Sequence, residues 1–340
     1  MESQGGFFDW QIRLDQLNEA GDPLVKLSKA INWNRFRVIL HKIRDKERKS
    51  LAGRRAYDVV LMFKILVLQS LYNLSDASVE YQVRDRISFM RFLGLKLGDP
   101  VPDEKTIWLF REQLGELGLV EKAFREFEDE LRKNGFSAKK GQIVDASIVD
   151  APVQHNSREE NKEIREGKTP DEWSKNKKCQ KDTDARWVKR NDGSRFGYKN
   201  HISMDVKHKL IRDYHVTDAS VHDSNVFMEL LDDGNSSRDV WADSAYRTPE
   251  ILDGLGESGF REHINRKGCR NRKLTEREKK GNRTRSRIRA RIEHVFGVQA
   301  KRAGVLLLRT IGIWRARIKI GLRNLAYNMD RYAHLVSVSR

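Results

Sequence analysis

The stretch Gln142-Ile143-Val144-Asp145-Ala146-Ser147-Ile148-Val149 decides the fold, because helical periodicity gives way there to an apolar β-strand pattern. A carboxylate is costly to place in such a strand unless a cation or a metal compensates its charge. We therefore expect Asp145 to have a charged partner. The alternative is a residue at the end of the strand that caps a turn.

Two further acidic residues stand in unusual settings. Asp243 follows the short apolar run 239–242, and Glu293 lies in an arginine-rich helical stretch. If both converge on Asp145, their oxygens form a negative cage suited to Mg²⁺ or Mn²⁺. The alternatives are an Asx-turn at Asp243 and an ordinary helical ion pair between Glu293 and Arg289. Other acidic residues compete for the same role: Asp150, Asp205, Asp213, Asp218 and Asp223.

Strand and helix patterns alternate after this first strand. Strands are expected at 142–149, 195–206, 210–216, 238–241 and 260–264. Helices are expected at 224–231, from 248, and from 275 onward with an interruption at 281–282. The order predicts a mixed α/β sheet with helices on its faces, which matches an RNase H-like fold. Residues 155–195 are densely charged, and we interpret them as an insertion or loop that either contacts DNA or is simply solvated.

The residues before this domain have a helical pattern. Positions 59–68 form a nearly continuous apolar run typical of a buried helix. Ser75 is expected to cap a helix that continues to about Phe92, and 119–134 is amphipathic. We predict an all-helical N-terminal domain at 1–138 and a catalytic domain at 139–340. The helices either bind DNA ends or dimerise.

The positive charge is confined to one end of the chain. The 340 residues have a formal net charge of +17. Residues 261–340 contain 23 Lys and Arg against 5 Asp and Glu, whereas residues 1–260 are nearly neutral. A charge confined in this way predicts a surface for a polyanion. By charge alone, DNA, RNA or an anionic membrane would fit, and a solvated basic face is the alternative.

Several classes of protein are disfavoured. No apolar run approaches the ~18–20 residues of a membrane span. The first residues lack the pattern of a signal peptide. Cys179 and Cys269 stand apart in charged surroundings, so neither a structural disulfide nor a zinc site is expected. The sequence predicts a soluble protein of a reducing compartment.

Five blocks of sequence, in a fixed order, resemble the DDE transposases of the IS5 group of bacterial insertion sequences, which are related to the IS4 type. The blocks are Ile143-Val144-Asp145-Ala146-Ser147, Phe196-Gly197-Tyr198-Lys199-Asn200-His201, Val216-Thr217-Asp218-Ala219-Ser220-Val221-His222-Asp223, Trp241-Ala242-Asp243-Ser244-Ala245-Tyr246-Arg247, and Arg289-x-x-x-Glu293-His294-x-Phe296. The resemblance covers nearly the whole chain.

The resemblance implies a catalytic and metal-binding triad of Asp145, Asp243 and Glu293 with two Mg²⁺ or Mn²⁺ ions. The IS4 signature has a Tyr three residues before the Arg and a Lys seven residues after the Glu. Here Ser286 replaces that Tyr, and the Lys position holds Ala300, with Lys301 next to it. Both departures weaken the match at these two positions.

The expected function is to bind the terminal inverted repeats, cleave the DNA and transfer its strands into target DNA. The expected partners are double-stranded transposon ends and target DNA, with a homodimer on DNA and no membrane. The expected location is the bacterial cytoplasm, in association with the nucleoid. Candidate DNA-binding residues are Arg289, Lys301, Arg287, Arg291, His294, Lys199, Tyr246 and Arg247. The alternatives are a nuclease that only hydrolyses DNA and a DNA-binding protein without activity.

Overall fold

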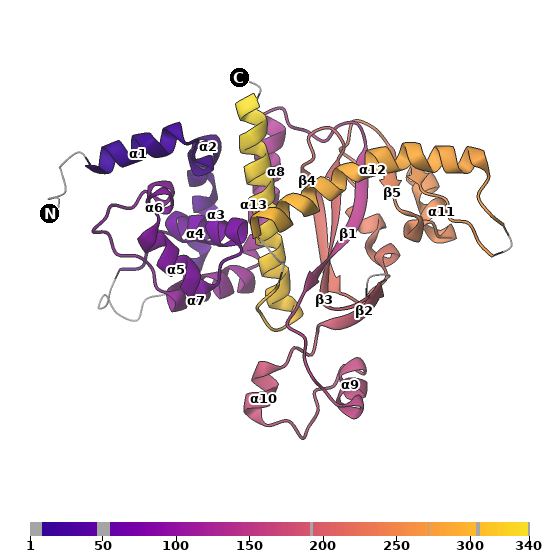
Figure 1. Cartoon of the computed structure of the whole chain (residues 1–340), viewed down its shortest axis with the longest axis horizontal. Coiled ribbons are helices and arrows are strands. Elements are labelled where there is room, and N and C mark those ends of the chain that lie inside the picture. Colours follow the sequence, from indigo (N-terminus) through magenta and orange to yellow (C-terminus); the bar gives the residue numbers. More distant parts are fainter. Residues whose placement is uncertain (1–8, 46–54, 191–192, 271, 304–306, 339–340) are drawn as a thin grey trace. The chain divides into compact units, whose positions relative to one another are not determined.

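The computed structural model describes residues 9–45, 55–190, 193–270, 272–303 and 307–338, with the side chains of 301–303 left out (Figure 1). The chain forms two compact units. Unit 1 comprises residues 1–123 and 325–340, and unit 2 comprises residues 124–324. The two units divide near residue 123, within a helix. The boundary between two domains that the sequence predicts, between residues 138 and 139, stays a prediction.

Unit 1 is helical, as the sequence predicts. Its elements are α1 (Asp9–Glu19), α2 (Pro23–Ala30), η1 (Trp33–Phe36), α3 (Arg37–His41), η2 (Lys42–Arg44), α4 (Val59–Tyr72), α5 (Asp76–Asp85), α6 (Ile87–Leu93) and α7 (Glu104–Glu116). The buried helix expected from the apolar run is α4, which has buried side chains on nearly every side. Asp58 caps it by accepting hydrogen bonds from the backbone N–H groups of Val60 and Leu61.

The helix expected from Ser75 to Phe92 is two helices. Ser75 does cap α5, because its hydroxyl accepts a hydrogen bond from the N–H of Ser78 at 3.1 Å. Arg86 then has an extended backbone (φ −99°, ψ 112°), which ends α5 and starts α6 in a new direction. The turn allows α6 to bury Phe89, Met90, Phe92 and Leu93. Burial of this apolar set compensates for the lost helical hydrogen bonds.

Unit 2 is built on a six-stranded mixed sheet (Figure 1). Its strands are β1 (Gln142–Asp150), β2 (Arg186–Arg190), β3 (Gly193–Asp205), β4 (Ile211–Asp218), β5 (Asp239–Ala242) and β6 (Arg261–Ile264). The order is β2-β3-β1-β5-β6, and β4 also pairs with β3. β3 is antiparallel to β1, whereas β5 pairs in parallel with β1, and β6 pairs in parallel with β5. The predicted mixed α/β sheet of the RNase H-like kind is confirmed.

Helices and short 3₁₀ turns complete unit 2. They are the second part of α8 (Leu119–Lys133), α9 (Arg158–Arg165), α10 (Lys175–Gln180), η3 (Asp223–Val226), η4 (Met228–Leu230), η5 (Ser244–Tyr246), α11 (Pro249–Glu257), α12 (Glu276–Ala303) and the first part of α13 (Ile313–Val338). α12 crosses one face of the sheet, against β1 and β5 (Figure 1).

Further predicted elements, all in unit 2, differ from the structure. The helix expected at 224–231 is a pair of 3₁₀ turns, η3 and η4. The interruption expected at 281–282 is absent, because α12 continues through Gly281 and Asn282. The charged insertion contains α9, α10 and strand β2. β2 is one edge of a long hairpin with β3, so tertiary pairing gives a charged segment a strand structure that its composition does not predict.

Among the described residues, no single helix is long and apolar enough to span a membrane; the bent pair α4 and α5 passes only by length and composition.

Gly141 shows how tightly the start of β1 is packed. Its φ is +81°, and a Cβ there would lie 2.5 Å from the carbonyl oxygen of Asp239 and 2.5 Å from the Trp241 ring. We expect Gly141→Ala to lower the free energy of unfolding by about 2–3 kcal/mol, because strain and overlap add. Gly135→Ala is the matched control, since Gly135 has φ +84° with no atom within 4 Å of a Cβ. Chemical denaturation that shows equal losses for both variants would contradict this packing argument.

Candidate active site

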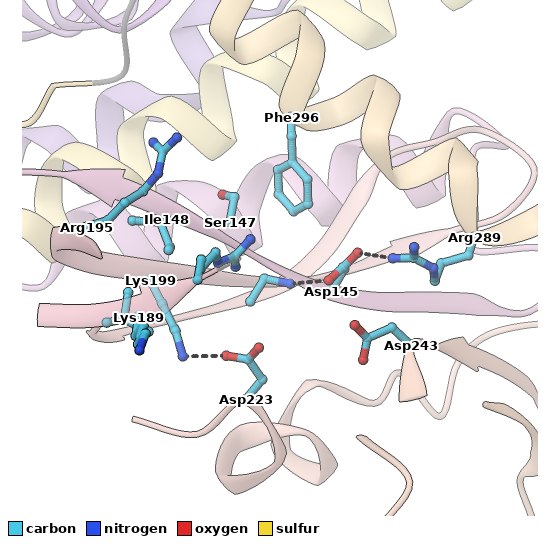
Figure 2. Close-up of a pocket in the computed structure, with 13 residues that line it drawn as sticks. Asp145, Ser147, Ile148, Lys189, Arg195, Lys199, Asp223, Asp243, Arg289 and Phe296 are labelled. Carbon is cyan, nitrogen blue, oxygen red and sulfur yellow. Dashed lines mark hydrogen bonds and ion pairs between the residues drawn. The ribbon is translucent and has the colours of Figure 1, made fainter. Parts of the chain in front are cut away.

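A pocket of about 680 Å³ opens where β1 and β5 stop pairing (Figure 2). The last paired residues are Ile143 and Trp241, so the edge of β1 is free of β5 from Val144 onward. Because the edge is open, side chains from both faces of β1 reach the pocket. Its lining residues are Asp145, Ala146, Ser147, Ile148, Val188, Lys189, Arg190, Arg195, Lys199, Asp223, Asp243, Arg289 and Phe296.

Asp145 has the charged partner that its apolar strand requires. Its Oδ2 lies 2.9 Å from Nη1 of Arg289 on α12, and its Oδ1 accepts a hydrogen bond from the N–H of Ala146. The carboxylate is only 17% exposed. Burial raises the pKa of Asp145 to about 6; Arg289 opposes the rise, while the negative charges of Asp243 and Asp223 add to it. Burial therefore raises the pKa of Asp145 by more than the nearby Arg289 lowers it.

Asp243 reaches the same pocket from the end of β5. Its Oδ1 accepts a hydrogen bond from the N–H of Ala245 at 2.7 Å, which caps the short turn η5. The Asx-turn and the approach to Asp145 are therefore both present. The hydrogen bond to one carboxylate oxygen fixes the Asp243 side chain, and the carboxylate still lines the pocket.

Glu293 is not among the residues that line the pocket. It lies one helical turn after Arg289 on α12, its carboxylate is 65% exposed, and Oε1 lies 3.9 Å from Nη2 of Arg289. This is the helical ion pair that the sequence offers as an alternative. Within the described parts of the chain, no three His, Cys, Asp or Glu side chains form a group that could hold a metal ion. The role of Glu293 as the third ligand remains a prediction.

Asp223 lies at the pocket, although in the sequence it is only one of several competing acidic residues. It begins η3 and is the last residue of the block that contains His222. Its Oδ1 lies 2.8 Å from Nζ of Lys199, and the side chains of Asp223 and Lys199 are 22% and 7% exposed. A signal was present in the sequence, because Lys199 and Asp223 stand in two of the five blocks.

Tyr246 lies deeper, with its side chain only 1% exposed and packed against Phe227. Its hydroxyl is a buried group without a hydrogen-bond partner in the described structure. Burial raises the pKa of Tyr246 well above its usual value, and Asp145, Asp223 and Asp243 add to the rise. The hydroxyl therefore lies within electrostatic reach of all three carboxylates. The prediction that Tyr246 contacts DNA is untested, and its ring is buried in this structure.

The other predicted DNA-binding residues are spread over α12 and the loop after β5. Arg287, Arg291 and His294 are exposed on α12. Arg291 donates a hydrogen bond to the carbonyl oxygen of Val206. Arg247 is paired with Glu262 at 3.0 Å. The side chain of Lys301 lies outside the described part of the structure.

The charged insertion contributes to the pocket. Lys189 and Arg190 of β2, and Arg195 of β3, line it together with Val188. Arg195 is paired with Asp150 at 2.9 Å. The insertion thus brings basic side chains to the carboxylates, which favours its interpretation as a segment that contacts DNA.

A carboxylate within β1 and another just after β5, inside a basic pocket of a mixed sheet, define a class of phosphoryl-transfer proteins. Residues 12–113 match the family described as "Transposase domain (DUF772)", and residues 136–329 match "Transposase DDE domain". The chain belongs to the DDE transposase family, whose members perform metal-dependent cleavage and transesterification of DNA.

One solved structure has a similar overall chain path. The piggyBac transposase in its synaptic complex with hairpin DNA is 12% identical, with 93% of this chain and 76% of that chain covered, at a TM-score of 0.45.

Proposed function

We propose that this DDE transposase binds the terminal inverted repeats of an insertion sequence of the IS5 group, exposes 3′-hydroxyls by hydrolysis and joins them to target DNA. Asp145, Asp243 and Glu293 would hold two divalent ions, Mg²⁺ or Mn²⁺. The observation that carries the proposal is the pairing of the buried Asp145 with Arg289 beside Asp243 in one basic pocket. When bound, the ions would activate the attacking hydroxyl and stabilise the leaving oxygen.

The pocket suits a hard divalent cation. Its donors are carboxylate oxygens, which Mg²⁺ and Mn²⁺ prefer over nitrogen and sulfur ligands. Burial raises the pKa of Asp145 to about 6 although Arg289 opposes the rise, so its negative charge is incompletely compensated. A cation between Asp145 and Asp243 would relieve that deficit. Glu293 has to turn its side chain toward the pocket to become the third ligand, and its exposure leaves it free of packing constraints.

We propose two states for Arg289. In the metal-free protein its guanidinium neutralises Asp145 at 2.9 Å. With cations bound, the guanidinium no longer has to neutralise the Asp145 carboxylate. It then binds a phosphate oxygen and holds the scissile strand in place. Arginine suits this exchange because its planar fork matches carboxylate and phosphate oxygens equally well.

The partners we propose are double-stranded transposon ends and target DNA, bound by a homodimer, because two ends have to be processed together. The N-terminal helices of unit 1 either recognise the ends or form the dimer. We place the protein in the bacterial cytoplasm, in association with the nucleoid.

The proposed function is tested with short duplexes that end in the element's terminal repeats. The protein is expected to nick them only with Mg²⁺ or Mn²⁺ and to join the exposed 3′-hydroxyl to a second duplex. Cleavage without joining would favour the hydrolytic nuclease. Binding with no cleavage under either metal would favour an inactive DNA-binding protein.

The basic residues of 283–319 are expected to supply most of the phosphate contacts. For B-DNA, the logarithm of the binding constant falls by about 0.9 per contact for each tenfold rise in salt. Neutralising Arg283, Arg287 and Arg291 on α12, which are exposed, should reduce this salt slope by about 2–3. The matched control neutralises Arg13, Lys26 and Lys29 of unit 1. Titrations at several salt concentrations that give equal changes for both sets would contradict the assignment.

A further inference from the structure

Lys199 is a buried lysine that lines the pocket. It comes from β3, whereas Arg289 comes from α12, so the two cations reach the carboxylates from different elements (Figure 2). The Lys199 side chain is only 7% exposed. An ammonium group is costly to bury unless partners compensate its charge and its N–H groups. The position of Lys199 is therefore maintained by specific contacts.

Two oxygens supply this compensation. Nζ of Lys199 donates a hydrogen bond to the carbonyl oxygen of Val221 at 2.6 Å and lies 2.8 Å from Oδ1 of Asp223. Both oxygens belong to the short segment that follows β4. An ammonium group has three N–H donors. One is donated to the Val221 oxygen, the Asp223 carboxylate lies at ion-pair distance, and the ammonium keeps an N–H for the pocket.

The neighbouring His201 cannot replace Lys199 as the cation beside Asp223. The Thr217 hydroxyl donates to the carbonyl oxygen of Asp218, so it accepts a hydrogen bond from Nε2 of His201 at 2.9 Å. Nδ1, which lies 3.9 Å from Oδ1 of Asp223, is then unprotonated. Burial lowers the pKa of His201 to about 4, so the ring is neutral at pH 7. Lys199 is thus the positive charge that balances Asp223.

We propose that Lys199 is a catalytic cation of DNA cleavage and joining, and that Asp223 is its positioning residue. Asp223 and the Val221 carbonyl aim the ammonium so that its remaining N–H meets a non-bridging oxygen of the scissile phosphate. Charge spreads over these oxygens in the transition state of phosphoryl transfer. A donor that is already oriented stabilises this charge without reorganisation. The inference rests on the proposed function and adds two residues to its machinery.

The test compares Lys199→Met, Asp223→Asn and the double variant in single-turnover cleavage at saturating DNA and Mn²⁺. Lys199→Met should lower the rate by about 10²–10³-fold, as removal of one transition-state donor does. Asp223→Asn should lower it by about 10-fold or more, because the ammonium remains but is no longer aimed. The double variant should be as slow as Lys199→Met and no slower, since Asp223 acts only through Lys199. DNA affinity should change little.

Asp213→Asn is the matched control. Asp213 is 28% exposed on β4 and pairs with Arg125 at 2.8 Å, much like Asp223 with Lys199. The Asp213→Asn variant should cleave DNA at the wild-type rate. Mn²⁺ affinity, measured by electron paramagnetic resonance on the protein without DNA, should be the same for Asp223→Asn and wild type.

Besides a wild-type rate in the double variant, three results would overturn the inference. They are wild-type cleavage by Lys199→Met, independent losses that multiply in the double variant, and a lost Mn²⁺ affinity in Asp223→Asn, which would make Asp223 a metal ligand. The double variant leaves no unpaired charge, so it remains informative if a single variant fails to fold, and a wild-type rate there also overturns the inference. A wild-type protein that does not cleave would instead refute the proposed function.

Discussion

Asp145→Asn is expected to abolish DNA cleavage, with a fall of about 10⁴-fold or more, which corresponds to about 5 kcal/mol or more of lost transition-state stabilisation. Asp243→Asn should have the same effect, because both carboxylates line one pocket. Each change removes a charge that the metal requires and no phosphate contact. DNA binding in a mobility-shift assay should therefore be unchanged or tighter.

Asp150→Asn is the matched control for the loss of an acidic group from β1. Asp150 is 27% exposed and is paired with Arg195 at 2.9 Å. It does not line the pocket, so cleavage should continue near the wild-type rate. Cleavage by Asp145→Asn or Asp243→Asn at the wild-type rate would remove that residue from the catalytic site.

The raised pKa of Asp145 also predicts how pH affects stability without metal. The folded protein holds this proton up to about pH 6, whereas the ordinary value is 3.8. Between those values the folded state binds more protons than the unfolded state, so stability falls as pH rises through this window. The full penalty above pH 6 is about 3 kcal/mol, at about 1.4 kcal/mol for each pKa unit. Asp145→Asn removes it.

The metal-free Asp145→Asn variant should therefore unfold at a higher temperature than wild type at pH 7.5. The difference should shrink toward zero as the pH falls to about 4. Mg²⁺ should stabilise the wild type and not the variant. A difference that is independent of pH between 4 and 7.5 would show that the Asp145 carboxyl is not the cause.

The sequence predicts the parts of the fold that local patterns determine. The strands around Asp145 and Asp243 are short apolar runs, and the buried helix α4 is a longer continuous one, so the length of each run identifies it. The break at Arg86 and the strand β2 depend on tertiary contacts instead. β2 is charged and half-exposed, and only its pairing with β3 makes it a strand. Its composition does not identify it as a strand; the local signal there is the hairpin-type dipeptide Asp192-Gly193 that follows it.

The residues of the site also divide into those that the sequence predicts and those that only the structure identifies. Asp145 needed a partner because of its apolar flanks, and the structure supplies Arg289 at 2.9 Å. Glu293 does not line the pocket, although its ion-pair partner Arg289, 3.9 Å away, does. Asp223 could not be chosen from spacing, since several aspartates had equal claims. Its proximity to the site follows from the turn after β4, which sequence periodicity does not describe.

Arg289→Ala is expected to lower the single-turnover cleavage rate by about 10²–10³-fold, since a misplaced or unneutralised phosphate costs this much. The Arg289 side chain is 24% exposed, lines the pocket and pairs with Asp145. A guanidinium that only balances Asp145 competes with the metal for that carboxylate. A guanidinium that clamps the phosphate is needed in the transition state, after the metal has taken its place.

Mn²⁺ affinity separates these two roles. In both cases Arg289→Ala should bind Mn²⁺ as tightly as wild type or more tightly, because a competing cation has left Asp145. Only the clamp predicts that cleavage stays slow when DNA and Mn²⁺ are both saturating.

Arg287→Ala is the contrasting variant, since Arg287 is exposed on the same helix and does not line the pocket. Its defect should disappear at saturating DNA, because it removes affinity and no transition-state contact. If saturating DNA and Mn²⁺ also restore the cleavage rate of Arg289→Ala, Arg289 only neutralises Asp145. The positive charge at the scissile phosphate then has to come from another residue of the pocket.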